Sequence, residues 1–154
     1  MTEKRLLGKT AWITGSSRGI GRVVADHLAS LGADVAIHGT SPLSTRAFGE
    51  ADSLQSVADA ISSAHGVRVV PVTGDLSDEG AVARCVEEIH QSFGRIDILV
   101  NCAGGDIGAA GTAGPKGGKP PVNDAIGIAV ADIRAVLDRN LMTCILCCRA
   151  VAPE

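Results

Sequence analysis

The chain has 154 residues, of which 45% are hydrophobic and 20% charged, a composition typical of globular rather than disordered proteins. A net charge of -3, with one tryptophan, two phenylalanines and no tyrosine, offers neither a basic surface nor stacking platforms, so nucleic-acid binding is not expected. No apolar stretch has the length of a membrane span, and the charged first residues lack the apolar core of a secretory signal, so no membrane partner is expected.

Residues 14–21, with the sequence TGSSRGIG, form the most informative stretch of the chain. An apolar run precedes them and an amphipathic run follows, which predicts a strand, a tight turn and a helix. The first N–H groups of such a helix have no partners, and with the helix dipole they favour a pyrophosphate. Gly15 suits a tight turn, Gly19 permits close approach of a ligand to the backbone, and Gly21 permits close helix–strand packing. The pattern predicts a nucleotide site, although a glycine-rich turn can also be a simple connector.

Apolar and amphipathic runs alternate along the rest of the chain. Strands are expected at about residues 10–13, 34–38, 67–72 and 96–100, and the intervening helices are expected to stop near Gly32, Gly66 and Gly94. Pro71 removes a backbone donor and therefore favours an edge position for the third strand. The alternation predicts an α/β fold: a Rossmann-type doubly wound parallel sheet with helices on both faces and strand order 3-2-1-4.

Two long loops interrupt this alternation. Residues 39–49 are rich in serine, threonine and proline, and residues 104–127 are dominated by glycine, alanine, proline and lysine. The second loop leaves the expected carboxyl end of strand four, beside the crevice where such sheets bind ligands. Its length fits a substrate gate and a disordered segment equally well.

Three further segments carry recognisable motifs. Asp75 and Leu76 follow the third strand, the sequence NCAG at 101–104 follows the fourth, and Asn140 lies in a later helical pattern. With the spacing of the glycine turn, these motifs resemble the short-chain dehydrogenase/reductase family, close to its 3-oxoacyl-carrier-protein reductase branch, from about residue 7 to the end. Cys102 stands where that family commonly has a second asparagine; the effect should be modest, because the backbone turn and Gly104 remain.

The resemblance implies a set of cofactor-binding residues at the turns that follow the strands: Gly15, Ser17, Arg18, Gly19, Ile20, Gly21, Thr40, Asp75, Leu76, Asn101, Ala103 and Gly104. By the same resemblance, Asp75 and the backbone of Leu76 would frame the adenine ring, and residues 101–104 would line the ribose on the nicotinamide side. Asp75 could instead cap the next helix, a role that Ser77 could also fill.

The end of the second strand favours NADP(H) over NAD(H). It reads His38-Gly39-Thr40-Ser41, with no carboxylate before Glu50 to bind a ribose 2′-hydroxyl or to repel a 2′-phosphate. Arg18 can supply a positive charge and Thr40 a hydrogen-bond donor, and the family resemblance points to NADPH for the same two positions. The alternative is that Arg18 and Thr40 are solvated loop residues. His38 is expected to be a surface residue at a strand end.

The catalytic part of the resemblance is incomplete. Asn140 matches the asparagine that holds a water chain leading to an active-site lysine; it could equally be a structural asparagine bonded to nearby backbone. The family's Ser, Tyr and Lys would lie beyond the matching part, and the chain has no tyrosine to protonate a carbonyl oxygen. We therefore interpret residues 1–154 as the cofactor-binding part of an NADP-dependent oxidoreductase of carbonyl/alcohol substrates, without the family's later strands. The alternative is a non-catalytic dinucleotide-binding module that is complete at this length.

The five cysteines form no disulfide framework and suit a reducing cytoplasm. Cys144, Cys147 and Cys148 fit buried helix positions better than a metal site, so no metal is expected. Without a fifth strand, strand four would expose its edge, so this part alone should associate. The full-length form is expected to be a homo-oligomer.

Overall fold

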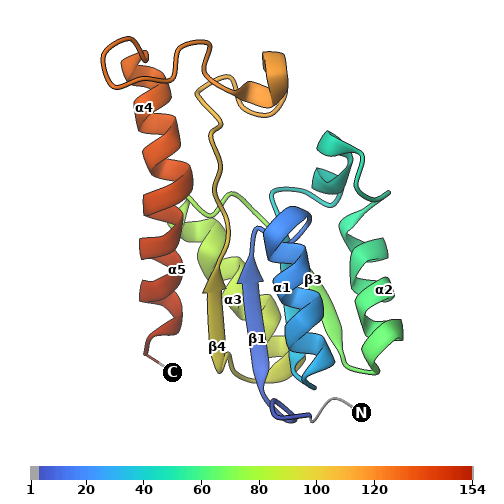
Figure 1. Ribbon diagram of the computed structural model, residues 1–154. Helices are drawn as coiled ribbons and strands as arrows, with labels where there is room; N and C mark the ends of the chain where they lie inside the picture. Colours follow the sequence, from blue (N-terminus) through green and yellow to red (C-terminus); the bar gives the residue numbers. More distant parts are fainter. Residues whose placement is uncertain (1–3, 154) are drawn as a thin grey trace.

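A parallel sheet of four strands forms the centre of the protein, which we describe for residues 4–153 from a computed structural model (Figure 1). The strand order is β3-β2-β1-β4, which confirms the predicted doubly wound topology. The strands are β1 (Thr10–Thr14), β2 (Asp34–Gly39), β3 (Val69–Thr73) and β4 (Ile98–Asn101). Pro71 lies in β3 at the edge of the sheet, as predicted, because β3 pairs only with β2.

Helices cover both faces of the sheet. They are α1 (Gly19–Ser30), α2 (Leu54–His65), α3 (Glu79–Phe93), α4 (Val130–Leu137) and α5 (Thr143–Val151), with a π-helical turn (Asp138–Met142) that joins α4 to α5. Side chains of α1 and α2 form one buried core with the sheet, and side chains of α3 and α5 form another. Figure 1 shows α4 and α5 as one long rod beside β4 that rises above the carboxyl ends of the strands. No helix of residues 4–153 is long and apolar enough to cross a membrane.

The alternation of side chains along the central strand explains the two cores. Ala11 and Ile13 of β1 pack toward α1 and α2, whereas Trp12 packs toward α3 and α5. All three are fully buried, and burial of a large apolar side chain such as that of Ile13 contributes about 1.5–3 kcal/mol. A strand that is apolar on both faces therefore requires a helical layer on each side.

Local capping explains where α2 and α3 begin and where α2 ends. Ser53 and Ser56 form a reciprocal capping box at the start of α2, and Gly66 (φ +67°) ends that helix in the left-handed conformation. Asp78 caps α3 by accepting a hydrogen bond from the Ala81 backbone N–H at 2.7 Å. Neither cap predicted from the sequence, Asp75 or Ser77, is used, because the chain makes one further turn before the helix starts.

The third and fourth strands begin two residues later than predicted. The backbone N–H of Arg68 donates to the carboxylate of Asp34, and the carboxylate of Asp97 accepts from the Thr10 backbone N–H. The residues just before both strands are also bonded through their backbones, since the Arg68 carbonyl oxygen accepts from the Val35 N–H and the Asp97 N–H donates to the Thr10 carbonyl oxygen.

Both long loops contain ordered turns. A 3-10 turn (Ser44–Phe48) lies in the loop after β2, and another (Pro115–Gly118) lies in the loop after β4. The second loop has its own hydrogen bonds: the Gly108 N–H donates to the Gly118 carbonyl, and the Asp132 carboxylate accepts from the Ala109 N–H. This segment arches above the sheet and ends at the start of α4 (Figure 1).

Candidate cofactor site

The three glycines of the 14–21 turn have different physical roles. Gly15 (φ +63°) lies against the turn after β4, and a Cβ atom there would come within 2.6 Å of the Ala103 Cα. A Cβ atom on Gly21 would come within 2.5 Å of the Gly15 carbonyl oxygen. Gly19 (φ +54°) has no atom within 4 Å of where its Cβ would lie. Gly15 and Gly21 are therefore required by packing, whereas the space beside Gly19 is open to a ligand.

Thr14 joins this turn to the NCAG motif. Its buried hydroxyl oxygen accepts hydrogen bonds from the backbone N–H groups of Cys102 and Ala103, both at 3.0 Å. Because the contact with Cys102 uses its backbone, the turn forms without the asparagine that is common at that position in the family. Sequence reasoning assigned Thr14 no role, since its partners lie almost ninety residues away and no local pattern indicates them.

His38 is buried, with 2% of its surface exposed, so the expectation of a surface residue is wrong. Its Nδ1 accepts from the Gly15 N–H at 3.1 Å, and its Nε2 donates to the Gly74 carbonyl oxygen at 3.0 Å. These partners select the neutral imidazole that carries its proton on Nε2. Burial lowers the pKa of His38 below its ordinary value of 6.5, against smaller raising effects from the Gly74 carbonyl and the Asp75 charge.

A carboxylate reaches the start of α1, which no local sequence pattern indicates. Arg18 occupies the N-cap position, its side chain does not cap the helix, and the first turn contains no acidic residue. The Glu50 carboxylate accepts instead from the Gly19 N–H at 3.1 Å, and Arg22 donates to the Glu50 carbonyl oxygen at 3.3 Å. The loop after β2 therefore folds back, so an anion already lies at the site where the helix dipole favours one.

A cavity of about 550 Å³ opens at the carboxyl ends of the strands, within the range of ordinary small-molecule sites. Most of the predicted cofactor-binding residues line it together: Gly15, Ser17, Arg18, Thr40, Asp75, Leu76, Ala103 and Gly104. Its wall also contains residues that sequence reasoning missed, from both long loops and from the π-helical turn: Leu43, Ser44, Ala47, Ile107, Gly111, Thr112 and Arg139.

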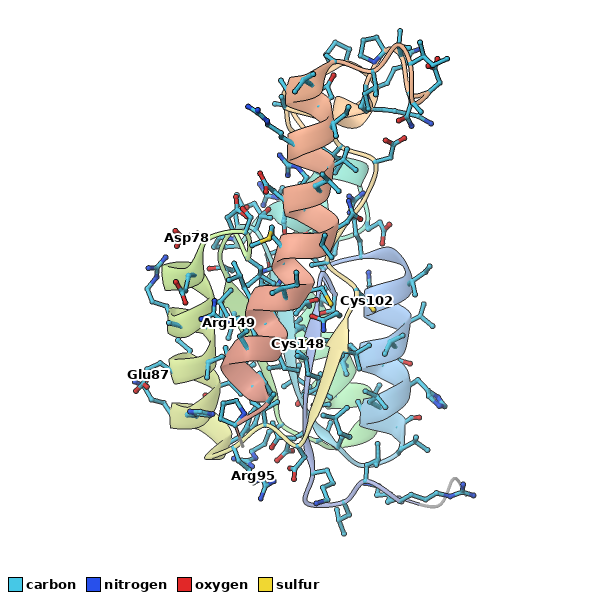
Figure 2. All side chains as sticks on the ribbon, turned by 90° about the vertical axis from the view of Figure 1, so that its left-hand side faces the viewer. Asp78, Glu87, Arg95, Cys102, Cys148 and Arg149 are labelled. Carbon is cyan, nitrogen blue, oxygen red and sulfur yellow. The ribbon has the colours of Figure 1, made fainter. Side chains whose placement is uncertain are left out.

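Four predicted residues lie outside this lining. Gly19 and Gly21 belong to the turn itself, and Ile20 is 80% exposed. The Asn101 side chain donates to the Cys148 sulfur at 3.4 Å, on the α5 side of the sheet. Figure 2 shows Cys148 on α5 beside the edge of β4 and Cys102 just beyond the end of that strand.

Asp75 and Arg139 both line the cavity, and the Arg139 charge acts on the Asp75 carboxylate. Burial alone would raise the pKa of Asp75, but hydrogen bonds from Ser77 and electrostatic interactions with Arg139 and His38 bring it below its ordinary value. The Nε atom of Arg139 is buried and has no hydrogen-bond partner among the described residues. A buried donor without a partner beside a cavity indicates a place where a ligand atom could accept a hydrogen bond.

Asn140 lies in the π-helical turn, a feature that often accompanies functional positions in helices. Its amide donates to the carbonyl oxygens of Val136 and Gly105 at 2.8 and 3.0 Å, and its Oδ1 accepts from the Gly105 N–H at 3.0 Å. Asn140 thus fastens the start of the 104–127 loop to the helix. This geometry matches the structural alternative for Asn140, and it also holds the residue close to Gly104 of the cavity wall.

Cys102 lies in the cavity wall, whereas Cys85 and Cys147 are buried in the core beneath α3 and α5. Burial raises the pKa of Cys85 to about 11 and that of Cys147 to about 12, which keeps both thiols protonated near neutral pH. All five cysteines are free. Among residues 4–153, no group of three or more His, Cys, Asp or Glu side chains is arranged to hold a metal ion.

Comparison with known proteins identifies the family. The sequence pattern of the family described as short chain dehydrogenase matches residues 9–154. The chain belongs to the short-chain dehydrogenase family. The 3-oxoacyl-[acyl-carrier-protein] reductase FabG of Aquifex aeolicus is 40% identical over 102 residues, which cover 66% of this chain and 38% of the relative. The cyclohexanol dehydrogenase of a Rhodococcus species is 34% identical over 151 residues, which cover 96% of this chain and 52% of the relative.

Solved structures of short-chain dehydrogenases share the fold. A short chain dehydrogenase from Burkholderia cenocepacia in complex with NADP is 33% identical with a TM-score of 0.75, covering 97% of this chain and 52% of that one. The L-sorbose reductase from Gluconobacter frateurii, complexed with NADPH and L-sorbose, is 27% identical with a TM-score of 0.77, covering 98% and 49%. The chain therefore spans about half the length of these relatives, or less. The resemblance inferred from the motifs is confirmed.

Proposed function

We propose that residues 1–154 supply the NADP(H)-binding Rossmann domain of an oxidoreductase that transfers hydride between NADP(H) and a carbonyl/alcohol substrate. The observation that carries the proposal is the convergence of three β–α turns and the NCAG turn on one cavity of about 550 Å³. In addition, the space beside the Gly19 backbone at the start of α1 is open to a ligand. The similar structures solved in complex with NADP or NADPH support the same assignment.

The residues of the cavity fit a dinucleotide. The N–H groups at the start of α1 are suited to a pyrophosphate, which would compete with the Glu50 carboxylate for the Gly19 N–H. Asp75 and the backbone of Leu76 would bind the adenine end, and Ala103 and Gly104 would line the opposite side. When bound, the nicotinamide group would supply or accept the hydride.

Cofactor preference depends on Arg18 at the start of α1 and Thr40 just after β2, which both line the cavity. A guanidinium and a hydroxyl can both donate to a 2′-phosphate, and no carboxylate lies among the lining residues 39–47 to oppose it. We therefore expect NADP(H) to bind more tightly than NAD(H). Glu50 lies at the pyrophosphate end, so it should weaken both cofactors rather than select between them.

Carbonyl reduction also requires a proton donor. The chain has no tyrosine, and within the part that the structure describes no lysine lines the cavity. We therefore propose that the acid is supplied from outside residues 1–154, and that Asn140 contributes by holding the backbone of the cavity wall.

An assay of NADPH oxidation tests this division of roles. The 154-residue chain and a chain extended through the family's remaining strands would be compared on a panel of ketones and 3-oxoacyl thioesters. We expect activity only in the extended chain, since loss of a general acid removes roughly 10²–10⁴-fold in rate. Turnover by the 154-residue chain that is lost in Asn140→Ala would contradict the proposal and require another proton donor.

We also propose that the full-length protein is cytoplasmic and forms a homo-oligomer. A stripe of large apolar side chains is exposed along the α4–α5 rod at helical spacing: Val130, Ile133, Leu137, Leu141 and Ile145. An apolar stripe of this kind requires a cover, which we assign to later parts of the protein and to a second copy. The five free cysteines suit a reducing compartment.

A further inference from the structure

His38 connects two turns that come from different β–α units. Gly15 belongs to the turn between β1 and α1, and Gly74 to the turn between β3 and α3. The imidazole bonds to both through its two ring nitrogens, at 3.1 and 3.0 Å. Its own backbone is held as well, since the His38 N–H donates to the Ser16 hydroxyl and the Ser17 N–H donates to the His38 carbonyl oxygen.

Only one protonation state of the imidazole can make both bonds. The Gly15 N–H is a donor and needs an acceptor on Nδ1, whereas the Gly74 carbonyl is an acceptor and needs a donor on Nε2. A protonated imidazole carries hydrogens on both nitrogens. Its Nδ1–H would then face the Gly15 N–H, so these two buried donors would oppose each other and neither would have an acceptor.

We propose that His38 is a positioning residue whose neutral imidazole holds the Gly15 and Gly74 turns together, so that acid weakens dinucleotide binding. This inference rests on the proposed cofactor function and concerns how the same cavity is maintained. Both turns lie at the cavity, where Gly15 and Asp75 are lining residues. Displacing the Gly15 turn would alter the backbone on which the cofactor phosphates are proposed to rest.

The charges around His38 set the direction of this effect. Burial opposes protonation most strongly, and the Asp75 carboxylate on the β3–α3 turn favours it. Arg18 and Arg139 are the charged groups of the cavity lining besides Asp75, and the lining residues 39–47 are uncharged. The pKa of His38 therefore lies below 6.5, so the unfolded chain binds more protons in mild acid and stability also falls as the pH decreases.

Calorimetric titration of NADP⁺ tests the proposal in the full-length protein from about pH 8 down to about pH 5.5. His38→Asn retains an acceptor for the Gly15 N–H but cannot titrate in this range. His27→Asn is the matched control, because His27 is exposed on α1. The 2′-phosphate of NADP⁺ titrates equally in every variant, and thermal unfolding at each pH shows that the protein remains folded.

We expect the parent and His27→Asn to lose about tenfold more affinity on acidification than His38→Asn, which corresponds to about 1.4 kcal/mol. The same acid loss in all three proteins would overturn the role of His38 while leaving the proposed function intact. Failure of the parent to bind NADP⁺ at about pH 8 would overturn the proposed function and this inference with it.

An NMR titration of the parent protein provides a second test that does not depend on the folding of a variant. Since the neutral imidazole supports the cofactor site, saturating NADP⁺ must lower the pKa of His38 further. An unchanged or raised pKa of His38 in the presence of NADP⁺ would overturn the proposal, because the negative charges of the cofactor by themselves favour the protonated imidazole.

Discussion

A comparison of two glycine-to-alanine variants separates backbone strain from loss of cofactor space. Gly19 and Gly66 both adopt positive φ, at +54° and +67°, and neither has an atom within 4 Å of the place that a Cβ atom would occupy. Alanine in this conformation costs about 1–2 kcal/mol, so Gly19→Ala and Gly66→Ala should lower the free energy of unfolding by similar amounts. Gly66 ends α2 and is not among the residues that line the cavity.

Only Gly19→Ala should affect the cofactor. Its methyl group would occupy the space through which a phosphate approaches the start of α1, so we expect at least a tenfold loss of NADPH affinity, about 1.4 kcal/mol. Gly19→Val should abolish binding. Calorimetric titration with NADPH measures the affinities, and urea denaturation measures the stabilities. Equal NADPH affinity in Gly19→Ala and Gly66→Ala would refute the reasoning, because the turn would then be only a connector.

Three further outcomes are expected. Arg18→Ala should weaken NADPH by roughly 1.5–3 kcal/mol and leave NADH almost unchanged in parallel titrations; equal affinities of the parent for both cofactors would rule out the preference. Glu50→Gln should tighten NADPH several-fold, about 1 kcal/mol, because an anion no longer competes for the Gly19 N–H; weaker binding would mean that Glu50 supports the site. The 154-residue chain should associate in light scattering, because the β4 edge and the α4–α5 stripe are exposed, and a monodisperse monomer over a wide concentration range would contradict this.

The sheet was predictable because its determinants are local. Strand and helix follow from the spacing of apolar residues, and the position of Pro71 agrees with the edge assigned to the third strand. Strand order followed from the family topology and the βαβ alternation. The turns that converge on the cavity could be located for the same reason, since parallel strands all end at one side of the sheet.

The features that sequence reasoning missed depend on contacts between distant segments. Glu50 accepts from the Gly19 N–H, 31 residues earlier in the chain. Thr14 accepts from the Cys102 N–H in a turn that lies 88 residues further on. His38 has a polar side chain at a strand end, which ordinarily indicates solvent, and only the neighbouring β1 and β3 turns make it a buried bridge. Arg139 adjoins Asn140 in sequence, but no local pattern shows that its guanidinium reaches the cavity.

Binding of the cofactor is the most direct test of the account. Calorimetric titration of the folded chain, with its helical content verified by circular dichroism, should yield one NADPH per chain. The affinity should exceed that for NADH, and Gly19→Val should abolish it while the circular dichroism spectrum is retained. A folded chain that binds neither cofactor would contradict the assignment of the cavity as a dinucleotide site.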